Sequence, residues 1–361
     1  MTKINSRQLC FIILTLSSVG KLFFLPGLIS GMAEEGLIIS TLINYVLDFS
    51  LLLIILGLYN KSSKGSFYKV LEDVFGKKIS KIILVFYAIF FIVKVIIPMI
   101  EEKNSIEFTF YETQPNVLTF IPIFIITFYI SIKGIKSFGK GLEIVTPIFL
   151  VGVLTIILLS FTVGDYNNLL PFFAKKPQVL FNASYKTLLW FGDPIFILFL
   201  LCEVKQDEKL NRKIILHYIL SAIIIVVILT IFYAVFYSIA KRQFYAPLKM
   251  SKYSITLSNI GRFDYVATLL LSFASIFHIA LPILLSSSIL KRVFKFNKSY
   301  ISPLIVNLTA CVLCLVFENG FFNLLNWFQN YGILFLIIFT YLLPCLVYIL
   351  YRRDKNETQK R

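Results

Sequence analysis

The chain alternates between long apolar runs and short polar segments. An α-helix needs roughly 20 apolar residues to cross the hydrocarbon core of a bilayer, and ten runs come close to that length. The fourth is the shortest, although residues 119–132 contain one proline and no charge. We therefore expect an all-α integral membrane fold with ten transmembrane helices, at residues 8–31, 36–59, 81–100, 117–132, 142–163, 183–203, 214–239, 263–290, 300–318 and 327–351.

Two of these runs are interrupted near their middle. The first contains Gly20, Lys21 and Pro26, and the sixth contains residues 192–194, a Gly-Asp-Pro sequence. Such residues disfavour a continuous lipid-facing helix, and non-helical backbone at membrane depth needs partners from protein or water. Interruptions at corresponding places in two halves are the best sequence indication of a binding site in secondary transporters. We expect broken spans one and six.

The ten spans divide into five and five. We expect a single transmembrane domain over residues 1–361, with a first five-helix repeat at 1–163 and an inverted second repeat at 183–351. Residues 352–361 are strongly charged and are expected to form a cytoplasmic tail.

Composition and charge agree with a membrane protein of defined orientation. Hydrophobic residues make up 58% of the chain and charged residues 15%, although the net charge is +16. Of the 35 Lys and Arg residues, 24 fall in segments on the side of the amino terminus, eight fall on the opposite side and three lie within spans. Because cytoplasmic loops carry an excess of basic residues, both termini are expected to be cytoplasmic. The positive charge is explained by this bias, so we expect no nucleic-acid partner.

Two polar segments between spans differ in character. Residues 67–75 place apolar side chains at helical spacing and predict a short amphipathic helix on the cytoplasmic surface. Residues 101–112, EEKNSIEFTFYE, carry a run of charges and are expected to be a solvated loop or a contact surface.

Several ionisable residues fall inside the predicted spans, where each costs a few kcal/mol or more and is a functional hypothesis by default. Lys21, Asp48, Asp193 and His278 are expected near mid-depth, and Lys94 lies nearer a span end. Two ammonium groups and two carboxylates can form a neutral set. Lys21 and Asp193 are therefore either a structural ion pair or contacts to a ligand or proton, and His278 is either hydrogen-bonded structure or a proton relay.

Four sequence features resemble the GerB-type spore germination proteins. They are Ser6–Gln8, the first-span break at Pro26, the Gly-Ile and Leu-Glu pairs within 134–143, and DYNNLLP at 165–171. The resemblance extends from residue 6 to about residue 350 and is most specific at NLLP. Members of that family are permease-like subunits of germinant receptors in the amino acid/polyamine/organocation superfamily. The resemblance thus implies a LeuT/APC-like fold.

The chain departs from that family's usual pattern at four positions. Lys136 follows Gly134 and Ile135 where glutamate is usual, and Lys140 stands at a position that is frequently arginine. Asp193 is a shorter carboxylate than is typical after the glycine of span six, and Lys21 lies where small residues are the norm.

The resemblance also implies how a ligand is held. In a split helix, amides of the second half attract an anion and carbonyls of the first half attract a cation. An amino acid carboxylate is then expected on the amides around 20–24, and its ammonium near the carbonyls before Asp193. Phe24, Phe191 and Tyr87 are either pocket walls or packing residues, since the chain has 37 Phe. The candidate ligand-binding residues are Gly20, Lys21, Phe24, Tyr87, Phe191, Gly192, Asp193 and His278.

Three functional hypotheses remain open, and none is enzymatic. The sequence has no HExxH, GxSxG, Walker or kinase motif, so we expect no catalytic residue, cofactor or metal. The first hypothesis is a germinant-receptor subunit in the spore inner membrane or cell membrane, which binds a small amino-acid-like germinant and contacts the lipid membrane and other receptor subunits. The second is a proton-coupled amino acid or small-solute transporter. The third is an ion-conducting or structural subunit without its own ligand.

Overall fold

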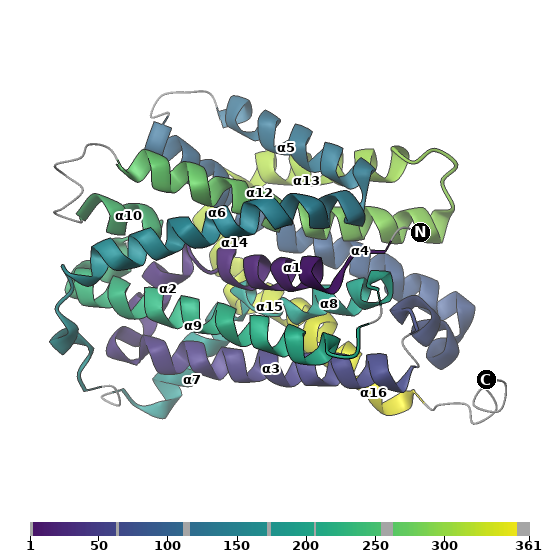
Figure 1. The fold of residues 1–361 in the computed structure, drawn as a ribbon, viewed down its shortest axis with the longest axis horizontal. Helices are drawn as coiled ribbons and strands as arrows, with labels where there is room; N and C mark the ends of the chain where they lie inside the picture. Colours follow the sequence, from purple (N-terminus) through teal and green to yellow (C-terminus); the bar gives the residue numbers. More distant parts are fainter. Residues whose placement is uncertain are drawn as a thin grey trace.

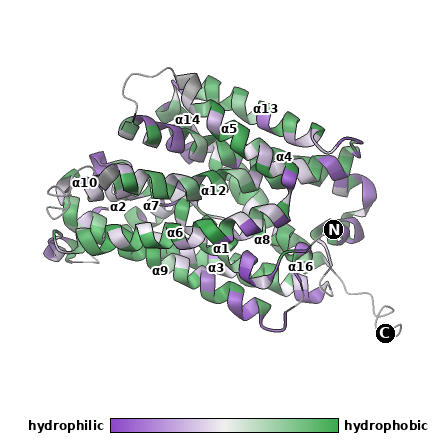
Figure 2. Ribbon diagram, turned by 45° about the horizontal axis from the view of Figure 1, so that its top comes forward, coloured by the Kyte–Doolittle hydropathy of each residue, from purple (hydrophilic) through white to green (hydrophobic). Residues whose placement is uncertain are grey.

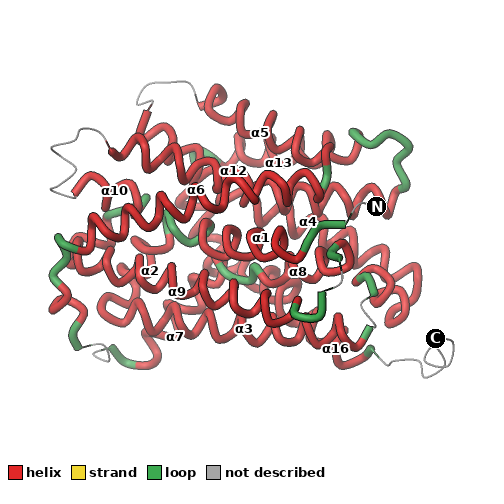
Figure 3. Tube along the Cα trace, viewed as in Figure 1, coloured by secondary structure: helices red, strands yellow, loops and turns green. Residues whose placement is uncertain are grey.

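The structure is a computed structural model that describes residues 3–62, 65–110, 116–171, 175–205, 207–253 and 263–351. Within these ranges the chain is helical and has no strand beyond one isolated parallel bridge between Ile4 and Val204 (Figure 3). The expected tail at 352–361 lies outside the described residues.

Most helices run side by side along the long axis of the molecule, and the start of α1 and the end of α16 lie at the same end (Figure 1). The helices are α1 Ser6–Val19, α2 Leu25–Ala33, α3 Leu37–Lys61, α4 Phe67–Phe110, α5 Asn116–Lys133, α6 Ile135–Phe161, α7 Pro177–Thr187, α8 Pro194–Leu200, α9 Leu210–Phe236, α10 Ala246–Tyr253, α12 Phe263–Phe294, α13 Ile301–Phe317, α14 Phe321–Trp327, α15 Ile333–Ile337 and α16 Leu343–Leu350. Two π-helical turns join α14, α15 and α16 into one continuous run.

The helices present apolar side chains outward as well as inward. Val46, Ile144 and Ile349 are 64%, 68% and 74% exposed, and hydrophobic residues predominate along the helices (Figure 2). Within the described ranges, seven helical runs are long and apolar enough to cross a membrane, and three shorter apolar helices accompany them at Ser6–Val19, Thr119–Lys133 and Ile301–Phe317. An apolar surface of this extent is suited to lipid rather than water.

The most enclosed elements lie next to two interruptions of helix. Helix α1 ends at Val19, residues 20–24 are not helical, and α2 begins at Leu25. Helix α7 continues as a 3-10 turn at Leu188–Trp190, residues 191–193 are not helical, and α8 begins at Pro194. Eleven of the 14 residues of α1 and all seven of α8 are buried. The interruptions therefore sit in the core of the bundle.

Helix α4 includes residues from both polar segments, and it confirms the helix predicted for the first and excludes a solvated loop over 101–110 in the second. It begins at Phe67 with the predicted amphipathic turns, which end where Gly76 adopts a φ of 76°. It then continues through residues 101–110, for which the sequence predicts a solvated loop or a contact surface. They form a helix with Glu101, Glu102 and Lys103 buried, which excludes the solvated loop. The charges are tolerated there because several have partners: Lys103 pairs with Glu107 at 2.6 Å and with a glutamate that follows α13.

Candidate functional site

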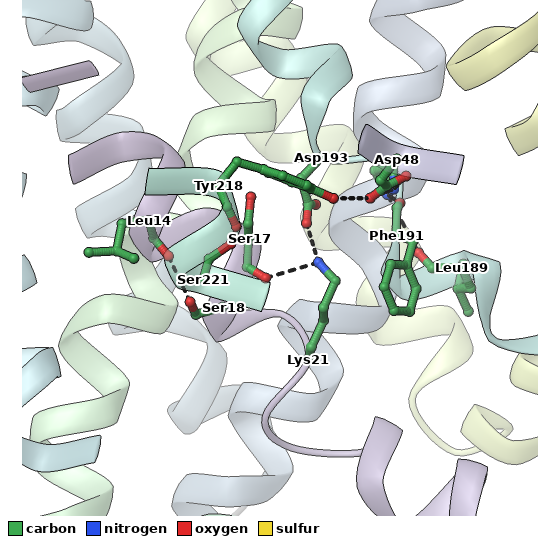
Figure 4. Close-up of polar contacts among 12 residues, drawn as sticks. Leu14, Ser17, Ser18, Lys21, Asp48, Leu189, Phe191, Asp193, Tyr218 and Ser221 are labelled. Carbon is green, nitrogen blue, oxygen red and sulfur yellow. Dashed lines mark hydrogen bonds and ion pairs between the residues drawn. The ribbon is translucent and has the colours of Figure 1, made fainter. Parts of the chain in front are cut away.

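An ion pair between Lys21 and Asp193 joins the two interruptions (Figure 4). Lys21 is 1% exposed and Asp193 6%. The Lys21 ammonium also donates to the backbone carbonyl of Ser17, near the end of α1, at 3.0 Å. It lies 4.8 Å from the ring centroid of Phe191, within cation–π range. The structure thus brings together two residues that are 172 positions apart in the sequence.

Asp48, from the middle of α3, holds the second interruption in place. Both carboxylate oxygens accept from the backbone N–H of Gly192 at 2.9 Å, and the hydroxyls of Tyr218 and Tyr341 donate to the same carboxylate. Gly192 has a φ of 85°, which L side chains rarely adopt. A Cβ at this position would also lie 2.5 Å from a methyl carbon of Thr340, so the turn requires glycine.

Lys94, from α4, donates to backbone carbonyls at the second interruption, as Lys21 does at the first. Its ammonium donates to the carbonyls of Phe191 and, at 3.5 Å, Leu189, which close the first half of that interrupted segment. At each interruption, a lysine of the chain therefore occupies the carbonyl end that would attract a cation. Together with Asp48 and Asp193, the two lysines form a four-charge set that is neutral when all are ionised.

A small cavity opens between the interruptions and helices α4 and α12. Its polar lining comes from Lys94, Trp190, Asp193 and His278, with the backbone of Gly20 on one side. The centre of a water-sized sphere can move through about 20 Å³ of it, which corresponds to about one water molecule. A Cβ on Gly20 would lie 2.7 Å from Nε2 of His278, so glycine is what allows the imidazole to approach the first interruption.

The structure places two of the eight candidate residues in aromatic packing away from this cavity. The ring of Phe24 stacks on Phe244 at 4.7 Å and contacts Tyr245 and Phe321 edge-on. Tyr87 donates its hydroxyl to the carbonyl of Phe339 at 3.1 Å and is surrounded by other rings. Gly20, Asp193 and His278 line the cavity, while Lys21, Phe191 and Gly192 form the contacts beside it.

The candidates predicted from the sequence lack three residues of this region: Trp190, and the two tyrosines that bind Asp48, Tyr218 and Tyr341. Trp190 lines the cavity and donates its indole N–H to Glu101 at 3.0 Å. Two features of the sequence could have identified Trp190 as a candidate. It lies directly before the second interruption, and it is one of only two tryptophans. Tyr218 and Tyr341 carry no such signal, because tyrosines are frequent in this chain.

Comparison with solved structures identifies the fold. The chain is similar to MhsT, solved in complex with L-phenylalanine, with a TM-score of 0.62 over 97% of this chain and 99% of that one. The two sequences are 13% identical, so the similarity concerns the fold alone. A search of curated proteins found no significant match.

The family follows from the sequence over most of its length. Residues 3–322 match the model of a family described as spore germination protein, the spore permeases. This match covers the two interruptions, the four-charge set and the cavity between them. With its apolar helical runs, the chain is an integral membrane protein that belongs to the spore germination protein family.

Proposed function

We propose that this protein is the permease-like subunit of a spore germinant receptor, which binds a small amino-acid-like germinant between the two interruptions and thereby triggers germination. The observation that carries the proposal is the cavity lined by Gly20, Lys94, Asp193 and His278, where two interrupted segments meet around buried charges. Intramembrane charges at such a junction are suited to a polar ligand.

The proposal includes a membrane arrangement of ten spans. Helices α1 and α2 form a broken first span, and α7 and α8 a broken sixth; α3, α4, α5, α6, α9, α12, α13 and the run α14–α16 form the others. Residues 1–163 and 183–351 are then inverted five-helix repeats of LeuT type. Both termini are cytoplasmic, which places α10 and the loops beside it outside.

Ligand recognition follows from the helix ends. The first amides of α2 are suited to a carboxylate, while Asp193 and the Ser17 carbonyl are suited to an ammonium group. The Lys21 ammonium already binds both Asp193 and the Ser17 carbonyl, so the ammonium group of a bound amino acid would displace the lysine from them. Since the cavity has room for about one water molecule, binding also requires the two interrupted segments to move apart. That movement is the event that partner subunits would detect.

A proton-coupled amino acid transporter is the second candidate. It is supported by the fold shared with MhsT, whose structure contains L-phenylalanine, and by His278 in the cavity. The two functions differ in what happens after binding. A receptor subunit in proteoliposomes would bind a radiolabelled amino acid without accumulating it, whereas a transporter would accumulate it under a proton gradient. Neighbouring genes for a large membrane-anchored subunit and a lipoprotein would favour the receptor.

A thermal-shift screen of the purified protein against amino acids, sugars and nucleosides tests the binding proposal. We expect at least one amino acid to raise the melting temperature, because a ligand that binds only the folded state stabilises it. Gly20→Ala should abolish that shift, since its Cβ would meet the His278 ring at 2.7 Å. The control is Gly57→Ala on α3, whose Cβ would lie 3.2 Å from Tyr348, remote from the cavity. Unchanged binding in Gly20→Ala would place the site elsewhere.

A further inference from the structure

A strip of polar side chains runs along the interface between α4 and α12, from the cavity toward the end of the bundle that carries α10. We call it the polar seam. On each helix the members are three and four residues apart, so they share one face. The polar seam consists of Glu102, Ser105 and Thr109 on α4, and Thr268, Ser272 and Ser275 on α12. The Thr268 hydroxyl donates to Thr109 Oγ1 at 3.1 Å and closes the two helices together at the far end.

Glu102 is the one member of the polar seam with an ionisable side chain. It is fully buried, and neither carboxyl oxygen accepts a hydrogen bond from the part of the chain that the structure describes. The hydroxyls of Ser272 and Ser275 lie next to it without reaching hydrogen-bond geometry. The hydroxyl oxygens of Ser105 and Ser272 are also buried without a partner among the described residues.

The neighbouring charges are committed to other partners. Glu101 accepts from Trp190 at 3.0 Å, and Lys103 pairs with Glu107 and Glu318. The remaining ionisable groups on the elements around Glu102 have contacts elsewhere. Lys94 donates to the Phe191 carbonyl, and His278 lines the cavity one turn after Ser275. Tyr245 stacks on the ring of Phe108, and the ammonium groups of Lys249 and Lys252 lie over that ring. Glu102 therefore has no counter-charge among the described residues.

An ionised carboxylate in such a place would be a buried charge without compensation, which is far costlier than the neutral acid. Buried oxygen atoms without protein partners are typically satisfied by water. Glu102 lies one helical turn after Pro98, and Ser275 one turn before His278, and both Pro98 and His278 line the cavity. The polar seam thus extends from the cavity past Glu102 to the Thr109–Thr268 contact near the end of the bundle that carries α10 (Figure 1).

We propose that Glu102 is a proton-binding residue, neutral at pH 7 and reached by water along the polar seam from the end of the bundle that carries α10. When it ionises, the carboxyl releases its proton to a seam water, and the hydroxyls of Ser272 and Ser275 rotate to donate to the carboxylate. The cavity is then linked to the pH of that side of the membrane through one titrating group. This inference is independent of the proposed germinant, because it concerns the ligand-free protein.

Infrared spectroscopy of the purified protein in lipid vesicles tests it without a ligand. We expect the wild type at neutral pH to show a carboxylic acid C=O band that is lost in Glu102→Gln. The band should shift in D₂O and fade as the pH is raised. The matched control is Glu101→Gln, which removes the adjacent buried carboxyl and should leave the Glu102 band in place.

A second variant keeps the test decisive if Glu102→Gln fails to fold. Thr109→Val keeps the side-chain shape but removes a hydroxyl at the far end of the polar seam, and it should slow the D₂O shift. Absence of a Glu102 band at neutral pH would show that the residue is ionised. A band insensitive to D₂O and pH would show a sealed acid, and an unchanged exchange rate in Thr109→Val would remove the polar seam as the route. Each of these results overturns the proposal.

Discussion

Removing the Lys21–Asp193 pair one partner at a time, and then both together, probes how the two interruptions are held. Lys21→Met leaves Lys94 facing two aspartates, and Asp193→Asn leaves Asp48 facing two lysines, so each single variant has one uncompensated buried charge. The double variant leaves Lys94 and Asp48, which balance. Breaking a buried ion pair by removing one partner costs about 3–5 kcal/mol, whereas replacing the whole pair by uncharged groups is often nearly neutral.

The expected result is therefore strong non-additivity. Each single variant should lose about 3–5 kcal/mol of folding free energy, and the double variant should lose less than their sum by at least about 1–3 kcal/mol. The measurement is the thermal unfolding of four proteins in one detergent: the wild type, the two single variants and the double variant. Abundance in the membrane is a second readout. Lys186→Met, on the half-buried last turn of α7, is the control for losing a lysine outside the pair and should change little.

Two outcomes would contradict this reasoning. Strictly additive losses would mean that the Lys21–Asp193 pair does not stabilise the junction. A Lys21→Met protein that melts like the wild type but no longer binds an amino acid would identify Lys21 as a ligand contact rather than a structural partner. Comparing the four proteins thus distinguishes a structural ion pair from a ligand contact, the two interpretations of Lys21 that the sequence alone leaves open.

Three further predictions concern the second interruption, the orientation in the membrane and the Asp207–Lys213 ion pair beside α9. Gly192→Ala should lower the melting temperature and impair binding, because φ at this position is 85°; normal stability would contradict the tight turn. In a cysteine-free background, Lys176→Cys should react with an impermeant thiol reagent from outside and Lys78→Cys should not, and the reverse pattern would invert the topology. The pKa of Asp207 is held below its usual range, first by a hydrogen bond from the Lys213 side chain at 2.5 Å. The ionised Asp207 side chain therefore stabilises the folded protein above the unfolded pKa of about 4, and this stabilisation is lost as the pH falls through the lower folded pKa. Unfolding curves measured over this pH range should show a smaller loss of stability in acid for Asp207→Asn than for the wild type.

The interruptions were predictable because glycine, proline and a charged residue within one apolar run all disfavour a continuous lipid-facing helix. Gly20 in the first run and Gly192 in the sixth lie where the structure leaves the helix, and Pro26 lies in the first turn of α2, directly after the first interruption. The Lys21–Asp193 pairing was available as one of two interpretations, because charges at mid-depth need partners. It could not be decided from the sequence, since pairing and ligand contact need the same residue types.

Other features depend on partners that local pattern cannot identify. The charge run at 101–110 favours a solvated loop over a contact surface, yet Lys103 is buried because it pairs with Glu318, 215 positions away in the sequence. For Phe24 and Tyr87 the sequence favours packing over a role as pocket walls, and the tertiary structure identifies the rings that they pack against. The role of Asp48 depends on Tyr341, which is 293 positions distant.

The neutrality of the four-charge set has a consequence for selectivity. Lys21, Lys94, Asp48 and Asp193 already balance, so a ligand that enters with a net charge leaves that charge uncompensated in a buried site. A zwitterion such as leucine adds both signs at once and preserves the balance, while lysine or glutamate adds one excess charge. Because an uncompensated buried charge costs several kcal/mol, the site is expected to sort amino acids by net charge before it sorts them by shape. Equal binding of leucine, lysine and glutamate in the thermal-shift screen would contradict this hypothesis.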